Sequence, residues 1–192
     1  MFTSEMLVST FFEINYTLWD DYNHGRISKH YIREQRFKLV FDKLKLPLQY
    51  YPTNFSKDYI YGCPTKTNIM PYAVEVLEYL KKRYTLHILT NGFNDVQGTK
   101  LTHSNLRPFF NHVITSESCG AKKPSLRIFE YTLALIKARK DDCLMIGDNL
   151  NSDIGGARNA AIDQVYYNPD QKAHSEQITY EIKCLSELKN IL

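Results

Sequence analysis

The sequence of 192 residues predicts an α/β protein, in which a small helical part precedes a larger part built on a parallel β-sheet. Up to about residue 66 the apolar residues recur at helical spacing. From Ile69 onward short apolar runs alternate with amphipathic helices, which is typical of βαβ units. We therefore expect two domains, residues 1–66 and residues 67–192.

The helical part is expected to contain two helices joined by a turn, over about residues 11–46. Gly25 breaks the helical pattern between them. Ser28 is suited to cap the second helix, and Pro47 is suited to end it. One more short helix is expected at residues 55–60.

In the second part each predicted helix leads to a predicted strand. The helices are expected at 73–83, 96–104, 126–138 and 154–160, and the strands at 86–89, 112–114, 143–146 and 164–167. Residues 178–192 predict a short edge strand and a closing helix. This order favours a sheet whose strands run parallel.

Composition excludes several classes of protein. The net charge of +3 is small and unclustered, which argues against nucleic acid or a membrane surface as a partner. The four cysteines are far apart and form no Cys-x-x-Cys pair, so neither a zinc site nor a disulfide scaffold is expected. No apolar stretch approaches the roughly 18 residues of a membrane span. A cytoplasmic protein fits these features best.

The most informative segment joins an apolar run to Gly147, Asp148 and Asp153. In a parallel sheet such a run is a buried strand, and ligands bind at the carboxyl ends of the strands. Carboxylates at this spacing suit Mg²⁺, which takes one or two protein carboxylates and leaves its other positions to water and phosphate. An N-capped helix after a strand is the alternative explanation for the same residues.

Two other segments place polar groups at strand ends. Thr90, Asn91 and Gly92 follow a predicted strand, and their hydroxyl, amide and backbone N–H groups can cradle a phosphate. Lys123 comes before Pro124, which is suited to the first turn of a helix and fixes where the lysine lies. Taken alone, these segments are also typical of a polar turn and of a solvated lysine.

Together, the ordered motifs Thr90-Asn91-Gly92, Lys123-Pro124 and Gly147-Asp148 with Asp153 resemble those of the haloacid dehalogenase-like hydrolases, over residues 69–192. That resemblance implies a doubly wound parallel core with a small α-helical cap. It implies that Thr90 and Lys123 are catalytic and bind the phosphoryl group, with Asn91 as a further phosphate contact. Asp148 is then a Mg²⁺ ligand, and Asp153 is either a second metal ligand or an acid that supports the first.

The same family has a motif Asp-x-Asp-x-Thr after its first core strand, and this sequence contains none. The nearest segment would put Glu13 and Asn15 in place of the two aspartates. Glutamate carries its carboxylate one methylene too far, and asparagine cannot transfer a proton. Residues 14–28 and 33–37 instead resemble the helical cap of the branch that dephosphorylates pyrimidine nucleotides. We therefore expect the chain to begin inside the cap, without the nucleophile strand.

In this family the nucleophile strand is central, between the strands that end at Thr90 and at Asp148. Without it, two rows of backbone groups are left unpaired beside an apolar trough. The sequence thus predicts a sheet that lacks its first core strand. Such a chain is expected to be either a truncated enzyme or a remnant with little stability alone.

The resemblance implies a Mg²⁺-dependent phosphomonoesterase for a small phosphorylated substrate, most similar to a 5′-nucleotidase. It would act through an aspartyl-phosphate whose nucleophile lies outside this chain. The alternative is an inactive remnant, or a phosphate- or metal-binding module with Glu13 and Asn15 in place of the nucleophile motif. A receiver-like signalling domain accounts for neither the helical first part nor the lack of an early acceptor Asp. Both a monomer and a homodimer remain open.

Four residues of the cap are candidates for substrate contact. Trp19 and Tyr22 can stack on a base, and Arg33 and Arg36 can pair with phosphate. Packing of the aromatic residues inside the cap, with solvated arginines, is the expectation we favour.

Overall fold

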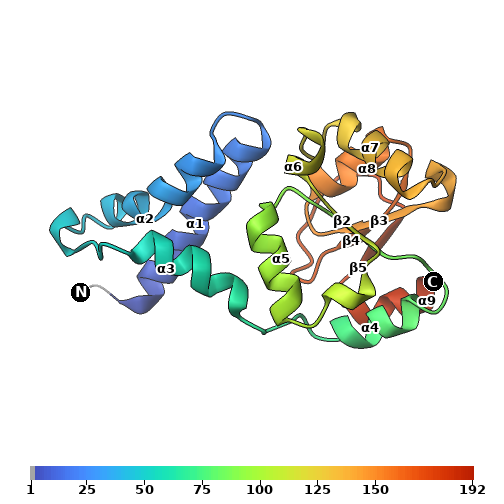
Figure 1. Ribbon diagram of the computed structural model, residues 1–192, viewed down its shortest axis with the longest axis horizontal. Helices are drawn as coiled ribbons and strands as arrows, with labels where there is room; N and C mark the ends of the chain where they lie inside the picture. Colours follow the sequence, from blue (N-terminus) through green and yellow to red (C-terminus); the bar gives the residue numbers. More distant parts are fainter. Residues whose placement is uncertain (1–2) are drawn as a thin grey trace. The chain divides into compact units, whose positions relative to one another are not determined.

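The computed structural model describes residues 3–192. They divide into two compact units, the first ending at Lys66 and the second beginning at Thr67. The first unit is helical and the second is an α/β unit (Figure 1). No helix within residues 3–192 is long and apolar enough to cross a membrane.

Within residues 3–66 the helical unit has three α-helices, α1 (Ser4–Asn23), α2 (Lys29–Lys43) and α3 (Phe55–Gly62). Gly25 lies in the turn with a positive φ of 74°, and the hydroxyl of Ser28 accepts a hydrogen bond from the Tyr31 N–H at 3.1 Å. The predicted turn and cap are therefore confirmed, although α1 begins earlier than predicted. Phe37 stacks on rings from both other helices, with centroids 5.5 Å from Phe11 and 4.2 Å from Phe55.

The α/β unit follows the predicted alternation of helices and strands. Its helices are α4 (Ala73–Leu80), α5 (Asn94–His103), α6 (Ser116–Cys119), α7 (Leu126–Ile136), α8 (Gly156–Asn159) and α9 (Leu188–Ile191). Its strands are β1 (His87–Thr90), β2 (His112–Thr115), β3 (Leu144–Gly147), β4 (Asp163–Tyr167) and β5 (Tyr180–Ile182). The short α6 is an element that the sequence pattern does not predict.

All strand pairs are parallel, but the strands form two separate sheets. β1 pairs with β2 in one sheet, and the other has the order β3-β4-β5. Within residues 3–192 no strand pairs with the second edge of β1 or with the second edge of β3. The sheet is therefore split at the place where the sequence predicts a missing core strand.

Helices cover both faces of the strands, as Figure 1 shows for α7 and α8 on one side and α4 and α9 on the other. One apolar cluster joins α4, α9, β4 and β5 through Val76, Leu80, Val165, Ile182 and Leu188. The second joins α7 and α8 through Ile128, Phe129, Ala157, Ala160 and Ile162. Alternate residues of β3 face the two clusters, which is the layering of a doubly wound fold.

The residues of β1 and β3, the strands beside the split, are less buried than those of β4. A parallel strand inside an α/β core is normally buried on both faces. Three of the five residues of β4 are buried, whereas all residues of β1 and β3 are only half-buried although most of them are apolar. The two strands that border the split therefore retain exposed apolar surface.

Candidate active site at the carboxyl ends of β1 and β3

The turn after β1 begins at Thr90, whose hydroxyl oxygen accepts a hydrogen bond from the Gly92 N–H at 2.9 Å. α5 starts close by, at Asn94, so the turn leads straight into a helix N-terminus. The threonine hydroxyl keeps its proton for an external acceptor. Backbone N–H groups at such a turn favour an anion.

Lys123 lies in the loop before α7 and is buried, with 6% of its surface exposed. Its Nζ donates to the Leu89 carbonyl oxygen at 2.7 Å and pairs with Asp153 Oδ1 at 2.8 Å. The lysine therefore contacts both β1 and the segment that follows β3. Pro124 precedes α7, which begins at Leu126, instead of lying in its first turn.

Asn91 is directed to the main chain of Lys123. Its Oδ1 accepts from the Lys123 N–H at 2.8 Å, and its Nδ2 donates to the Lys123 carbonyl oxygen at 2.9 Å. The side chain is buried, so a polar group here needs such partners. The sequence predicts a phosphate contact at Asn91, and in the structure both groups of its amide pair with the main chain of Lys123.

Asp153 lies in a π-helix (Leu150–Gly155) between β3 and α8, and it is buried. Besides Lys123, its carboxylate accepts hydrogen bonds from the Ser152 hydroxyl at 3.0 Å and from the Asn149 N–H at 3.2 Å. π-Helical turns are frequent at functional sites. Here the turn carries a carboxylate into the end of the sheet.

Asp148 directly follows β3 and is exposed. Tyr166 lies opposite Gly147 on the neighbouring strand β4. Burial raises the pKa of the Tyr166 phenol, and the negative charge of Asp148 adds to that increase. Asp148 is thus the carboxylate of this strand end that faces solvent.

The donor set suits Mg²⁺ only in part. Two carboxylates follow β3, and Mg²⁺ commonly takes one or two with water and phosphate. Both oxygens of Asp153 already accept hydrogen bonds, whereas Asp148 is exposed. Among residues 3–192 no group of three or more His, Cys, Asp or Glu gathers as a metal site. Asp148 is accordingly the better candidate for a metal ligand.

Two residues of the site are absent from the sequence-based prediction. Asn149 caps the π-helix, because its Oδ1 accepts from the N–H groups of Asn151 at 3.1 Å and Ser152 at 2.8 Å. Ser152 then reaches the Asp153 carboxylate. Asparagine is a preferred residue at the start of a helix, so Asn149, two residues after β3, could have been predicted as a cap.

Glu13 and Asn15 lie in the middle of α1, inside the helical unit, and not at a strand end. Glu13 forms an exposed ion pair with Lys43 of α2. These positions do not give the two residues the place of a nucleophile motif after a core strand.

Three of the four candidate substrate contacts pack against other residues of the helical unit. Tyr22 is buried, and Trp19 packs edge-on against it with ring centroids 5.6 Å apart. Arg36 is buried with its guanidinium 5.1 Å from the centre of the Tyr59 ring, and burial lowers its pKa. Arg33 is half-buried. The packing role that we favour for the aromatic pair agrees with this geometry, but Arg36 is not a solvated arginine.

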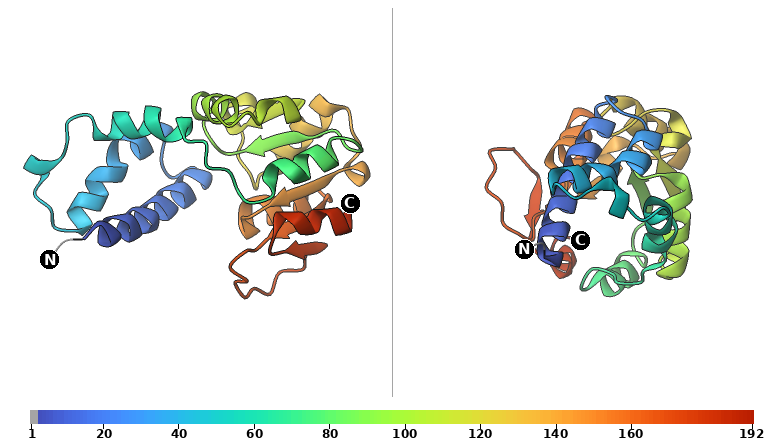
Figure 2. Two further views of the ribbon diagram at one scale, coloured as in Figure 1. Left: turned by 90° about the horizontal axis from the view of Figure 1, so that it is seen from below. Right: turned by 90° about the vertical axis from the view of Figure 1, so that its left-hand side faces the viewer.

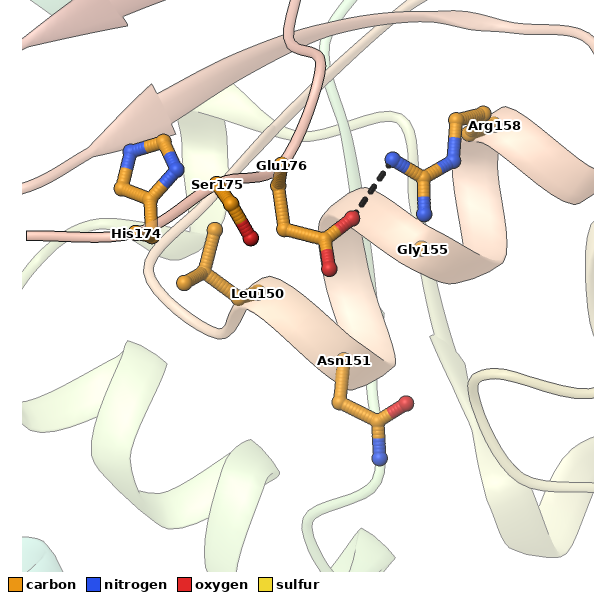
Figure 3. A pocket seen from close by; sticks show the side chains of 7 residues that line it. All are labelled: Leu150, Asn151, Gly155, Arg158, His174, Ser175 and Glu176. Atoms are coloured by element: carbon orange, nitrogen blue, oxygen red, sulfur yellow. Dashed lines mark ion pairs between the residues drawn. The ribbon is translucent and has the colours of Figure 1, made fainter.

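A pocket of about 430 Å³ lies beside the π-helix (Figure 3). The loop between β4 and β5, which stands out from the unit in Figure 2, forms one side of it. The pocket is lined by Leu150, Asn151, Gly155, Arg158, His174, Ser175 and Glu176. Arg158 Nη1 pairs with Glu176 Oε2 at 2.7 Å across its edge. None of Thr90, Asn91, Gly92 and Lys123 lines this pocket.

Comparisons with known proteins, by sequence and by structure, both find haloacid dehalogenase-like hydrolases. Residues 12–161 match the family of haloacid dehalogenase-like hydrolases. The chain is 30% identical to the pyrimidine 5′-nucleotidase YjjG of Escherichia coli, over 93% of this chain and 79% of that protein. It is 33% identical to the pyrimidine 5′-nucleotidase PynA of Streptococcus pneumoniae, over 93% and 78%.

A solved structure is similar over the whole length of the chain. The HAD-hydrolase YfnB of Bacillus subtilis, crystallised with bound magnesium, superimposes with a TM-score of 0.87 and 28% identity. The match covers 100% of this chain and 83% of YfnB.

Proposed function

The chain belongs to the haloacid dehalogenase-like hydrolase family, and from that premise we propose that it is part of a Mg²⁺-dependent phosphomonoesterase. The proposed substrates are nucleoside 5′-monophosphates. The observation that supports this most is the buried Lys123 ammonium, held between the end of β1 and Asp153 after β3. A fixed positive charge at this edge suits a phosphoryl group.

In the proposed reaction the residues of this chain bind and orient phosphate. The Thr90 hydroxyl donates a hydrogen bond to a phosphoryl oxygen, and the Gly92 region offers backbone N–H groups. Lys123 neutralises the charge that develops on the phosphoryl oxygens. Asp148 would hold Mg²⁺, which when bound supplies further charge neutralisation. Asp153 keeps Lys123 in place.

The attacking carboxylate is proposed to come from a strand that fills the split between β1 and β3. Both strands border the split with unpaired edges and half-buried residues. A parallel strand there would bring its last residue to the carboxyl ends of β1 and β3. An aspartate at that position would meet the phosphate that Thr90 and Lys123 hold.

The test extends the chain at its amino end with a designed apolar strand, a segment Asp-x-Asp-x-Thr and a helix-forming linker. Release of phosphate from UMP, CMP and dTMP is measured with Mg²⁺, beside the unextended chain. Turnover by the extended chain alone is expected, with loss of at least about a hundredfold in Asp148→Asn. A variant of the extended chain with Asn in place of the first Asp of the added Asp-x-Asp-x-Thr segment should lose activity at least as strongly as Asp148→Asn.

The matched control is Asp163→Asn, which makes the same chemical change at the amino end of β4. It should retain the activity of the extended chain. A folded extended chain without turnover, or Asp148→Asn with full turnover, would contradict the proposal.

A second candidate function is a non-catalytic module that binds Mg²⁺ or phosphate. It is favoured by one observation, the lack of an Asp-x-Asp-x-Thr motif in the sequence. Binding to the native state alone raises the thermal midpoint. Mg²⁺ or inorganic phosphate should then raise the midpoint of the unextended chain, and Asp148→Asn should remove the effect of Mg²⁺.

A further inference from the structure

Asn91 uses its side-chain amide as a substitute for a strand neighbour. A backbone peptide offers one acceptor and one donor, and a neighbouring strand residue pairs with both. The amide of Asn91 offers the same two groups, and both pair with the main chain of Lys123, at 2.8 Å and 2.9 Å. The two residues are 32 positions apart in the sequence. The loop that carries Lys123 is therefore attached to the end of β1.

The side chain of Lys123 is fixed at its other end as well. Its Nζ lies 2.7 Å from the Leu89 oxygen and 2.8 Å from Asp153 Oδ1, in a position where 8% of the lysine side chain is exposed. A buried ammonium requires such partners, because an unpaired buried charge is costly. Its partners are reached only if the main chain of Lys123 stays where Asn91 holds it.

We infer that Asn91 is a positioning residue for Lys123, and that it acts on this ammonium through the lysine main chain and not by contact with phosphate. The geometric part of this inference stands on the four contacts above. Its consequence for catalysis rests on the proposed function. Loss of the amide should free the loop, and the ammonium should then leave its place between Leu89 and Asp153.

The chain contains a matched control for this inference. Asn168 is also buried, and it makes the same pair of contacts with the main chain of Lys172: Oδ1 accepts from the Lys172 N–H at 2.9 Å and Nδ2 donates to its carbonyl at 3.0 Å. The Lys172 ammonium, however, pairs with Asp170 at an exposed place. The Asn168 contacts can therefore stabilise a loop but cannot position a buried ammonium.

The experiment measures how fast each lysine of the intact, unextended chain reacts with an amine-acylating reagent, followed by mass spectrometry. In the wild type, Lys123 should react far more slowly than Lys172, which serves as the exposed reference. In Asn91→Ala the rate at Lys123 should rise at least about tenfold, because the reaction of a buried group follows its local opening. In Asn168→Ala the rate at Lys123 should stay at the wild-type value. Urea midpoints of both variants show that each is folded under the labelling conditions.

If Asn91→Ala does not fold, Asn91→Asp replaces it in the experiment. Aspartate keeps the volume of the side chain and the acceptor for the Lys123 N–H, but it lacks the Nδ2 donor to the Lys123 carbonyl. Lys123 of this variant should also react faster than in the wild type. An unchanged rate at Lys123 in the folded Asn91 variants would overturn the inference, and so would an equal rise in Asn168→Ala. Labelling needs no turnover, so an extended chain without phosphatase activity would contradict the proposed function and leave this test intact.

Discussion

Gly147 shows how one residue permits the arrangement of the candidate site. A Cβ atom at this position would lie 2.4 Å from Asp153 Oδ2 and 2.5 Å from Asp153 Cβ. The carboxylate that pairs with Lys123 therefore occupies the space that any other residue would need. The glycine that ends β3 is required by this close approach.

Gly147→Ala is expected to displace Asp153 and lower the free energy of unfolding by about 1–3 kcal/mol, the usual cost of overpacking. Urea denaturation followed by circular dichroism measures the change. Gly98→Ala is the control, because a Cβ there meets no atom within 4 Å. Gly98 lies inside α5, so its replacement should stabilise the protein by roughly 0.5–1 kcal/mol. Wild-type stability in Gly147→Ala would show that Asp153 can move freely.

His87 and His112 form a residue pair at the start of β1 and β2. They are register partners, and their rings stack with centroids 5.3 Å apart. Burial lowers the pKa of His87, and the positive charge of His112 lowers it further. Because the folded state then binds its proton less well than the unfolded state does, stability is complete above the unfolded pKa of about 6.5 and falls as pH decreases.

His87→Phe is expected to reduce this loss of stability between about pH 7 and pH 5. The measurement is the urea midpoint as a function of pH, for the variant and the wild type. His103→Gln, at an exposed position near the end of α5, should leave the wild-type pH dependence in place. If the urea midpoint falls with pH as steeply in His87→Phe as in the wild type, groups other than His87 cause the pH dependence.

At the scale of elements, the two strands that border the split differ from β4 in pairing and burial. Among the strands of residues 3–192, β4 has a partner on each side, whereas β1 and β3 have one each. In the described part of the chain, no strand offers an acceptor to the amide hydrogens on the outer edges of β1 and β3, and these amides lie beside half-buried side chains.

Hydrogen exchange followed by mass spectrometry should therefore find β4 as the most protected strand of the unit. Peptides that cover β1 and β3 should retain fewer slow amides per residue than peptides from β4. In the extended chain of the proposed function, protection of β1 and β3 should rise toward that of β4. Equal protection of the three strands in the unextended chain would contradict the expected effect of the split.

Helices and strands could be predicted from the sequence where the local pattern of apolar and polar residues determines them. Four apolar runs gave the first four strands to within one residue at each end, because a short apolar run between polar residues suits a buried strand. The helix predicted from Ile154 instead begins as a π-helix at Leu150, since the Asn149 side chain caps the chain earlier. The contacts of Lys123 with Leu89, the residue before Thr90, and with Asp153 agree with the expectation that these segments meet at one edge of the sheet. The bond between Asn91 and Lys123 could not be predicted, because no local pattern reports a partner 32 residues away.

At the scale of the whole molecule, Lys123 adds a polar link between the two sheets of the α/β unit, beside the apolar contacts that Leu89 and Met145 make with the same cluster. Its ammonium donates to Leu89 in the sheet of β1 and pairs with Asp153, which follows the sheet of β3. Cooperative unfolding of the unit should depend on such contacts between the two sheets.

Lys123→Met is expected to lower the free energy of unfolding by about 3–5 kcal/mol, because Asp153 then keeps a buried charge without its partner. The urea transition should also broaden as the sheets uncouple. Combining it with Asp153→Leu should cost less than the two single changes together. The control is Lys189→Met, which removes an exposed pair with Glu75 and should change stability by less than about 1 kcal/mol. A wild-type midpoint and slope in Lys123→Met would refute this role.

The free edges of β1 and β3 also bear on how copies of the protein behave toward one another. A strand edge with apolar side chains and unpaired backbone groups is a template on which another chain can add a strand. Neither edge carries a Pro or a Lys within its strand, the residues that usually discourage such pairing. Filling the split would thus protect the protein from self-association, so the strand that we propose to carry the attacking carboxylate would also lower the tendency of copies to pair.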